Sequence, residues 1–217
     1  MIDPLLYLRA VGVRLGDTPI LRGVDLRVGA GEVVGLVGAN GSGKTTLLRV
    51  AATLLVPTGG EGEVLGAGLT DEARYAIRSR IGLIGHTPAL YQNLTLEENT
   101  RFVAQLMGAE PGSVGAALDQ VGLAGARHRR AIQCSHGMQR RAEFARLLIS
   151  NPDLVLLDEA HAGLDRHAAD LVAFILQGVR SRGGGAMLVS HEHNRMAPLV
   201  DRVVELRNGA VGHWEAE

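Results

Sequence analysis

Residues 31–51 read GEVVGLVGANGSGKTTLLRVA and change character twice along their length. The first part, around VVGLV, is a short β-branched run that predicts a buried strand. Glycines then recur up to Gly43, and after Lys44 the apolar residues follow helical spacing. The loop between strand and helix matches the pattern G-x-x-x-x-G-K-[ST] from Gly38 to Thr45. This order predicts a phosphate-binding loop (P-loop) in a protein of the α/β class.

The P-loop offers the groups that bind nucleotide phosphates. Its glycines let the backbone bend so that N–H groups face the β- and γ-phosphates, and the dipole of the following helix adds attraction. Lys44 brings a positive charge to those phosphates, and the Thr45 hydroxyl is a ligand for Mg²⁺. The residues expected to contact the nucleotide here are Gly38, Ala39, Asn40, Gly41, Ser42, Gly43, Lys44, Thr45 and Thr46.

A second run, LVLLDEAHAGLD at residues 154–165, ends a predicted buried strand with two carboxylates. Asp158 is placed to hold Mg²⁺ at the strand's carboxyl end, and Glu159 to orient or deprotonate the attacking water. Taken alone, the pair could merely cap the next helix, but the P-loop favours the catalytic interpretation. His191 follows the strand AMLVS and is placed to hydrogen-bond the γ-phosphate, or a group on the side of the site where Glu159 lies. Its surroundings read SHEH, which excludes the H-E-x-x-H pattern of zinc proteases.

Composition narrows the class of protein. Of 217 residues, 46% are apolar and only 3% aromatic, so Leu, Val, Ile and Ala must build the core, as in parallel α/β sheets. The formal net charge of -1 disfavours a nucleic-acid partner. The single cysteine, Cys134, excludes an internal disulfide and fits a reducing compartment. No apolar run is long enough to span a membrane, so we expect a cytoplasmic protein that reaches a membrane through partners.

The remaining patterns predict a mostly parallel sheet with two additions. Alternating apolar residues at 5–13 and 20–28 predict antiparallel strands, and the turn-rich segment 57–68 predicts a hairpin. Further strands are predicted at IGLIG, GAMLVSH and RVVELRNG. Helical patterns cover residues 71–80, 96–123 and 139–150. We therefore expect an N-terminal antiparallel β region and an inserted helical subdomain beside the parallel core.

The segment AIQCSHGMQRRAEFARLL, residues 131–148, has two interpretations. A short polar turn precedes an Arg-rich helical run. The turn is either a plain loop in which Ser135 caps the helix, or a surface that completes a nucleotide site on another molecule. Ser135 offers a hydroxyl, Gly137 a bare backbone N–H, and the helix a positive dipole end, all suited to a phosphate.

Over essentially its whole length the chain resembles the ATP-binding subunit of ABC transporters. The P-loop, the LLDE strand, the AGLD turn at residues 162–165 and Ser190-His191 occur in that family's order. The family's LSGGQ signature falls on the turn at residues 134–138, where Cys134, His136 and Met138 replace its first, third and fifth letters. The resemblance implies a P-loop NTPase of ABC type that binds ATP. Residues 1–217 would form a single ABC ATP-binding domain, with a helical subdomain at about 87–150.

The resemblance also implies a mode of action. Two copies form a homodimer, in which Ser135, Gly137 and Met138 of one copy contact the γ-phosphate of ATP held by the other. ATP binding closes the dimer and hydrolysis opens it, which passes motion to integral membrane transporter subunits. The segment ALYQNLTLEEN after His86 is the implied coupling surface. The subunit would then lie on the inner face of the cell membrane, attached through its partners.

Four further positions depart from the family pattern. His86 replaces the glutamine that normally follows the strand IGLIG, where it can position water or pair with phosphate. Leu15 stands where the family usually has an aromatic residue that stacks on adenine, so base recognition is weaker or uses Tyr7 or another group. Ala160-His161 replaces the usual proline and its neighbour after Glu159.

Two of the departures resemble one branch of the family. The IGH-x-P segment and an S-x-GM-x-x-R signature are similar to the haem exporter ATP-binding subunit of bacterial cytochrome c maturation. That branch implies a haem-handling protein among the partners. The alternatives are a drug, lipid or polysaccharide exporter, a soluble ABC ATPase acting on nucleic acid, and a nucleotide-binding regulator that barely hydrolyses ATP. The single near-neutral chain, without basic patches or coiled-coil insertions, disfavours the soluble ATPase.

Overall fold

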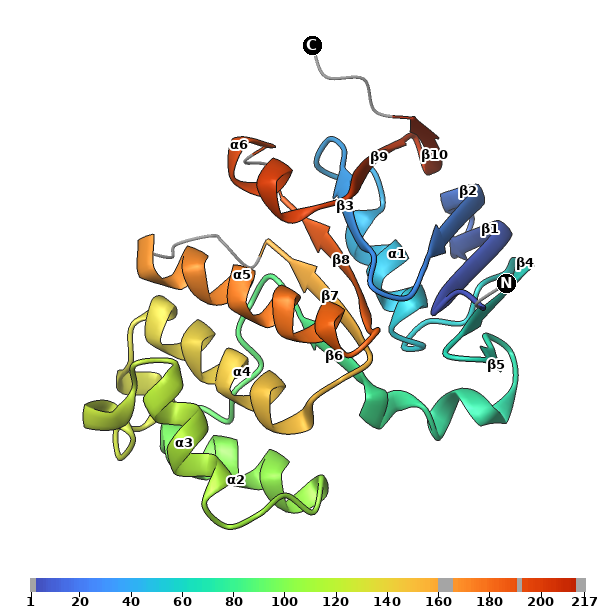
Figure 1. The fold of residues 1–217 in the computed structure, drawn as a ribbon. Helices are drawn as coiled ribbons and strands as arrows, with labels where there is room; N and C mark the ends of the chain where they lie inside the picture. The colour runs from blue at the N-terminus through green and yellow to red at the C-terminus, as the bar shows by residue number, and fades with distance from the viewer. Residues whose placement is uncertain (1–2, 160–165, 191–192, 214–217) are drawn as a thin grey trace.

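A six-stranded sheet forms the centre of the protein in the computed structural model, which describes residues 3–159, 166–190 and 193–213 (Figure 1). The strand order is β10-β9-β3-β8-β7-β6, and all neighbours pair in parallel except β10, which is antiparallel to β9. The strands are β3 (Val33–Val37), β6 (Ile81–Ile84), β7 (Leu154–Asp158), β8 (Gly185–Val189), β9 (Arg202–Arg207) and β10 (Ala210–His213).

The three middle strands are buried on both faces. Strands β3, β7 and β8 read VVGLV, LVLLD and GAMLV, and every residue in them is buried. Alternate residues of β7 therefore join two separate cores: Val155 and Leu157 face one, and Leu154 and Leu156 face the other. Continuous apolar runs of this kind are typical of parallel strands covered on both sides. The predicted parallel α/β core is confirmed.

A second, four-stranded antiparallel sheet covers one face together with helix α1 (Lys44–Ala51). Its order is β2-β1-β4-β5, and β1 alternates buried and exposed residues, as expected for a strand with one solvated face. The predicted pair of N-terminal strands and the predicted hairpin are both confirmed. The strands are β1 (Leu6–Leu15), β2 (Thr18–Val28), β4 (Gly59–Val64) and β5 (Ala67–Gly68).

Helices cover the opposite face. Between β6 and β7 the chain forms α2 (Leu96–Leu106), α3 (Ser113–Gln120) and α4 (His136–Ser150), which pack on one another (Figure 1). Helix α4 also lies against α5 (Arg166–Ser181), whose apolar residues join the same core. The helical pattern predicted for residues 96–123 is confirmed, with a break between α2 and α3. Helix α4 begins three residues earlier than predicted, because Ser135 caps it.

The prediction of one helix over residues 71–80 is wrong. The segment contains two single 3₁₀ turns, η1 (Glu72–Tyr75) and η2 (Arg78–Arg80). Only Ile77 is buried here, so no apolar face stabilises a continuous helix. Arginine side chains fix the segment instead: Arg74 donates to the Thr70 carbonyl, and Arg78 donates to the Thr53 carbonyl.

The other short turns connect the main elements. They are η3 (Ala124–Ala126), η4 (Ala131–Gln133), α6 (His193–Met196) and η5 (Ala197–Leu199). Within the described ranges, no helix combines the length and the apolar character needed to cross a bilayer.

Candidate nucleotide-binding site

The P-loop leaves the carboxyl end of β3 and enters α1, as its sequence predicts. Gly43 is the residue before the helix and has a φ of 106°, a conformation that favours glycine. Gly38 has a φ of 148°, and a Cβ there would lie less than 3.0 Å from the carbonyl oxygen of Leu206 in β9. The loop is therefore held close to the backbone of the neighbouring strand, and a side chain at Gly38 would displace it.

Lys44 and Ser42 give the P-loop polar groups that can bind phosphate. The Lys44 ammonium donates to the carbonyl oxygens of Gly38 and Ala39 at 2.8 and 2.9 Å, which holds a positive charge over the loop. The Ser42 hydroxyl is buried and has no hydrogen-bond partner among the described atoms. Leaving such a group unpaired costs free energy, and a phosphate oxygen would satisfy it. The loop therefore fits a polyphosphate.

Strand β7 brings its terminal carboxylate to this loop. Asp158 is buried, and its Oδ2 accepts a hydrogen bond of 2.8 Å from the Thr45 hydroxyl. The two residues meet because the carboxyl ends of parallel strands lie at one edge of the sheet. A hydroxyl and a carboxylate oxygen are the hard ligands that Mg²⁺ prefers, with the remaining positions filled by phosphate and water. The two residues predicted to hold the metal therefore lie together.

Glu159, the next residue, has a strained backbone and faces His86. Its φ is 52°, a left-handed conformation that is uncommon for a residue other than glycine, and its N–H donates to Val189 of β8. Strain of this kind costs about 1–3 kcal/mol and concentrates at functional sites. The His86 Nδ1 lies 3.6 Å from Glu159 Oε2, with the imidazole 70% exposed and the carboxylate 23% exposed. The two side chains thus meet at the edge of the site.

One cavity of about 300 Å³ joins most of the predicted nucleotide residues. An adjoining cavity of about 740 Å³ is lined by Ala39 and Ser42 and shares Ile20, Asn40 and Gly41 with the first. Ile20 was not predicted, because an apolar residue in a β-strand gives no sign that it borders a ligand site. The predicted residues that line the first cavity are Asn40, Gly41, Gly43, Lys44, Thr45, Thr46, His86, Asp158 and Glu159.

The turn at residues 134–138 does not reach the P-loop of its own chain. Ser135 caps α4, because its hydroxyl accepts from the Met138 N–H at 3.3 Å, so the capping interpretation holds within the chain. Neither Ser135, Gly137 nor Met138 lines the two cavities at the P-loop, and Ser135 is exposed. Burial raises the pKa of the Cys134 thiol, which disfavours its thiolate form.

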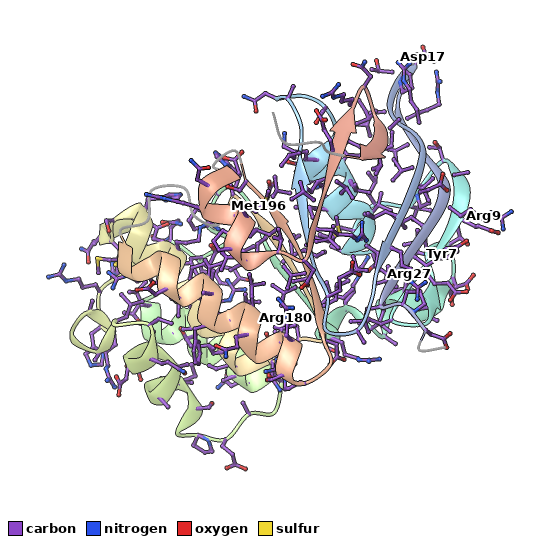
Figure 2. The ribbon with its side chains drawn as sticks, turned by 45° about the horizontal axis from the view of Figure 1, so that its top comes forward. Tyr7, Arg9, Asp17, Arg27, Arg180 and Met196 are labelled. Carbon is purple, nitrogen blue, oxygen red and sulfur yellow. The ribbon has the colours of Figure 1, made fainter. Side chains whose placement is uncertain are left out.

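Tyr7 lies far from the site. Strand β1 pairs Leu15 with Thr18 at the hairpin next to the P-loop cavities, whereas Tyr7 pairs with Arg27 at the other end. The separation along β1 is roughly 25 Å at the usual rise per residue. Figure 2 shows Tyr7 and Arg27 well away from Asp17 at the hairpin turn.

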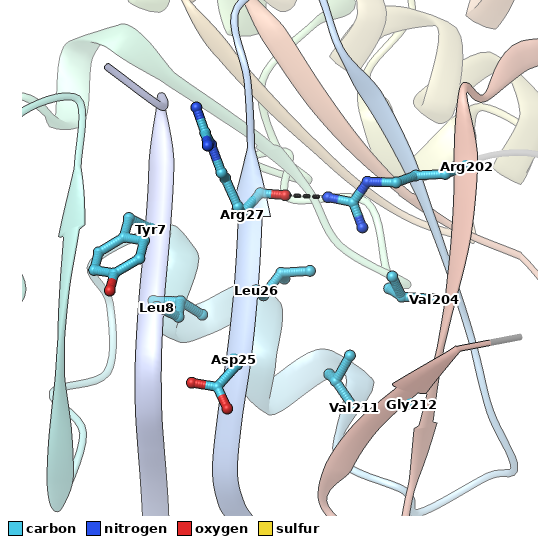
Figure 3. A pocket seen from close by; sticks show the side chains of 9 residues that line it. All are labelled: Tyr7, Leu8, Asp25, Leu26, Arg27, Arg202, Val204, Val211 and Gly212. Carbon is cyan, nitrogen blue, oxygen red and sulfur yellow. Dashed lines mark hydrogen bonds between the residues drawn. The ribbon is translucent and has the colours of Figure 1, made fainter. Parts of the chain in front are cut away.

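Tyr7 instead borders a separate cavity of about 440 Å³ between β1 and β2 on one side and β9 and β10 on the other (Figure 3). There Arg202 donates to the Arg27 carbonyl. The alternative that Tyr7 contacts the base is therefore wrong.

Leu15 is exposed at the hairpin. His191, the AGLD turn at 162–165 and Ala160-His161 lie outside the described residues.

Comparisons with known proteins agree with this geometry. The model of the ABC transporter family matches residues 21–162. The lipoprotein-releasing system ATP-binding protein LolD of Anaeromyxobacter dehalogenans is 42% identical over 203 residues, which cover 89% of this chain and 85% of that protein. The cytochrome c biogenesis ATP-binding export protein CcmA of Agrobacterium fabrum is 37% identical over 186 residues, which cover 84% of this chain and 86% of that protein.

A solved structure matches the whole fold. It is the dimeric structure of a post-hydrolysis state of an ATP-binding cassette bound to ADP and Pi, with a TM-score of 0.86 and 25% identity. The match covers 98% of this chain and 100% of that one. Because the family model spans more than half of the chain and both relatives align over most of it, the protein belongs to the ABC transporter family as an ATP-binding, ATP-hydrolysing subunit.

Proposed function

We propose that the chain is the motor of a membrane exporter and works as a homodimer. The observation that carries this proposal is the cavity that joins the P-loop to Asp158, Glu159 and His86. The exposed Ser135 turn, which stays away from its own P-loop, supports a role on the partner's nucleotide. In this arrangement Ser135, Gly137 and Met138 of each copy contact the γ-phosphate of ATP bound to the other. The similar cassette bound to ADP and Pi is itself dimeric.

The residues of the cavity divide the reaction among them. The P-loop N–H groups and Lys44 bind the phosphates. Thr45 and Asp158 would hold Mg²⁺, which would supply positive charge beside the transferred phosphate. Glu159 orients the attacking water and accepts its proton, since its carboxylate lies beside the P-loop residues and is largely shielded from solvent. His86 fixes the Glu159 carboxylate or the water from the exposed side.

His191 is assigned to the γ-phosphate on sequence grounds. It follows β8, whose carboxyl end lies at the same edge of the sheet as Asp158. A mutation of His191 to alanine is expected to slow hydrolysis more than it weakens ATP binding.

The surface after His86 is the proposed contact with integral membrane subunits, and it belongs to the helical subdomain at about 87–150. Buried Asn99 accepts from the Tyr91 N–H at 2.8 Å and donates to the Tyr91 carbonyl at 3.0 Å, which fixes this segment against α2. The rings of Tyr91 and Phe102 then meet edge to face at 5.4 Å and remain exposed. Grouped exposed apolar side chains are typical of protein interfaces. Such partners would hold the chain at the cytoplasmic face of the membrane.

For the cargo, we propose haem export in c-type cytochrome biogenesis, with a haem-handling protein in the complex. The IGH-x-P segment at His86 and the altered signature support this proposal, as does the similarity to CcmA. Lipoprotein release is the second candidate, because the identity to LolD is higher.

The test is to purify tagged protein from detergent-solubilised native membranes, identify the co-purifying chains by mass spectrometry, and record a visible spectrum. Cytochrome c maturation proteins, with or without a haem band, would support haem export. A lipoprotein-releasing permease, or any other exporter permease, would refute haem export and leave the motor function in place. The absence of any membrane protein would refute the transporter proposal itself.

A further inference from the structure

Arg140 is an arginine in the interior of the protein. Its side chain is 0% exposed and extends from α4 beneath the loop that follows β6. Its Nη1 donates to the Gly85 carbonyl at 2.7 Å, and its Nη2 donates to the His86 carbonyl at 2.7 Å. The guanidinium therefore binds the carbonyls of the two peptide groups on either side of the His86 Cα.

Two more charged residues of α4 complete the same network. The carboxylate of Glu143, 4% exposed, accepts from Arg140 Nη1 at 2.8 Å through one oxygen. Its other oxygen accepts from the Ala89 N–H at 2.8 Å, and Arg146 donates to the Ala89 carbonyl at 2.6 Å. These residues lie three apart and so share one face of the helix. Residues 85–89 are thus bound through their backbone by three side chains of a single helix.

Stability alone does not account for this network. Burying a guanidinium and a carboxylate is costly, and apolar side chains of similar volume often serve stability equally well. Burial lowers the pKa of Arg140, an effect that the Glu143 charge opposes, and burial raises the pKa of Glu143. The Arg140 Nε–H is also buried without a partner among the described atoms. The charged groups instead fix the geometry of the loop, since a planar guanidinium holds the carbonyls that it binds in defined positions.

The position of the network relates it to hydrolysis. At one end the network binds the backbone of His86, whose Nδ1 lies 3.6 Å from Glu159 Oε2. Its base is the first turns of α4, which begins at the Ser135 cap five residues before Arg140. At the rise of a helix, the two residues are roughly 7.5 Å apart along one rigid element. A displacement of the Ser135 turn would therefore move the backbone of His86.

We propose that Arg140 and Glu143 are positioning residues for hydrolysis, which set His86 against Glu159 and tie that contact to the Ser135 turn. This inference rests on the roles assigned above to His86 and Glu159. Neither Arg140 nor Glu143 lines the two cavities at the P-loop, so we assign their main effect to the loop at residues 85–89, beside an attraction of the Arg140 charge to Asp158. A displacement of about 1 Å in a reacting group can cost about a hundredfold in rate, so small shifts of this loop are sufficient.

The first test is a double-mutant cycle in the full chain, read as steady-state ATP hydrolysis. Glu143→Gln and Arg140→Lys should each lower kcat about tenfold while KM for ATP stays within about twofold. In a His86→Ala background, Glu143→Gln should have no further effect beyond about twofold. Asp119→Asn is the matched control, because Asp119 also pairs with an arginine, Arg127, but at the surface of α3. It should leave kcat unchanged.

The second readout does not depend on turnover. Hydrogen exchange followed by mass spectrometry should show faster exchange in a peptide spanning residues 85–91 of Arg140→Lys and Glu143→Gln, and no change in Asp119→Asn. If one of the two variants fails to fold, as judged by thermal unfolding, the other gives the same comparison.

The outcomes separate this inference from the proposed function. The positioning role would be overturned if the effects of Glu143→Gln and His86→Ala on kcat multiply in the double mutant, or if hydrogen exchange at residues 85–91 is unchanged. The proposed function would still stand in that case, provided that the parent hydrolyses ATP. A parent without turnover, or a His86→Ala variant as active as the parent, would refute the assigned roles of Glu159 and His86, and this inference with them.

Discussion

Replacing Gly38 with alanine tests how the P-loop is held. A Cβ at this position would lie less than 3.0 Å from the Leu206 carbonyl oxygen and 2.8 Å from Ser42 Oγ. The carbonyl belongs to β9, which is paired to β3 and cannot turn aside. The backbone conformation, with φ at 148°, is also one that side chains rarely adopt. The substitution therefore adds both strain and overlap.

The expected cost follows from these two contributions. Holding a residue other than glycine in a disfavoured conformation costs about 1–3 kcal/mol. Forcing extra atoms into a packed site adds about 1–3 kcal/mol. Gly38→Ala should therefore lower the free energy of unfolding by about 2–6 kcal/mol, unless the loop moves away from β9. In that case the loss appears instead as weaker ATP binding, at about tenfold for every 1.4 kcal/mol.

Gly41→Ala provides the matched control. Gly41 lies in the same loop with φ at 79°, but a Cβ added there would have no atom within 4 Å. It should lose only the backbone contribution, about 1–2 kcal/mol. Urea unfolding without nucleotide, followed by titration of a fluorescent ATP analogue, measures both losses. If Gly38→Ala and Gly41→Ala lose the same free energy of unfolding and bind ATP equally, the close approach to β9 does not hold the loop.

Three further substitutions have defined outcomes. Lys44→Ala removes a charged group worth about 1.5–3 kcal/mol per hydrogen bond, so ATP affinity should fall at least about tenfold; unchanged affinity in a fluorescence titration would contradict the role of Lys44. Thr95→Ala removes the cap of α2 and should lower the free energy of unfolding by about 0.5–2 kcal/mol. Hydrogen bonds from Thr95 lower the pKa of Glu98 below its usual 4.5, so their stabilising effect is present above pH 4.5 and lost as the pH falls below it. Urea unfolding should therefore show the difference between parent and Thr95→Ala shrinking at acid pH, and a constant difference would be the contrary result. Glu143→Ala leaves the Arg140 charge buried without its partner and should cost about 3–5 kcal/mol in urea unfolding, and a loss below about 1 kcal/mol would mean that the pair is not buried as described.

The parts of the site that the sequence predicted are those that local chemistry determines. The P-loop is a single turn between a strand and a helix, and its glycines and Lys44 act within eight residues of one another. Asp158 and Glu159 end a buried strand, and parallel strands bring such ends to one edge. These positions follow from pattern and topology, without knowledge of how side chains pack.

The parts that sequence reasoning missed depend on contacts between distant segments. Arg140 and Glu143 read as charges of a solvated helix face, yet they are buried against the backbone of residues 85–89. Their neighbours Ala142, Phe144 and Ala145 are buried as well, so α4 is enclosed nearly all round in this stretch. Little in the sequence signals this enclosure, because α4 also carries Gln139, Arg141 and Arg146 and so resembles a solvated helix.

The helix expected at residues 71–80 fails for a related reason. Its residues suit a helix locally, but the fold gives them no surface to pack on. The backbone makes the i→i+3 hydrogen bonds of 3₁₀ turns instead, and arginine side chains bond to the carbonyls of Thr53 and Thr70. Tyr7 is offered as one alternative to the aromatic residue missing at Leu15, whereas the register of β1 puts it at the far end of the strand.

The central claim is that Glu159 directs water in an ATPase site formed by the P-loop and β7. The direct measurement is the steady-state rate of ATP hydrolysis by the full chain and by Glu159→Gln, with ATP binding measured on both. The account predicts turnover in the parent, a loss of about a hundredfold or more in Glu159→Gln, and unchanged ATP affinity. Equal rates in the two proteins would contradict it.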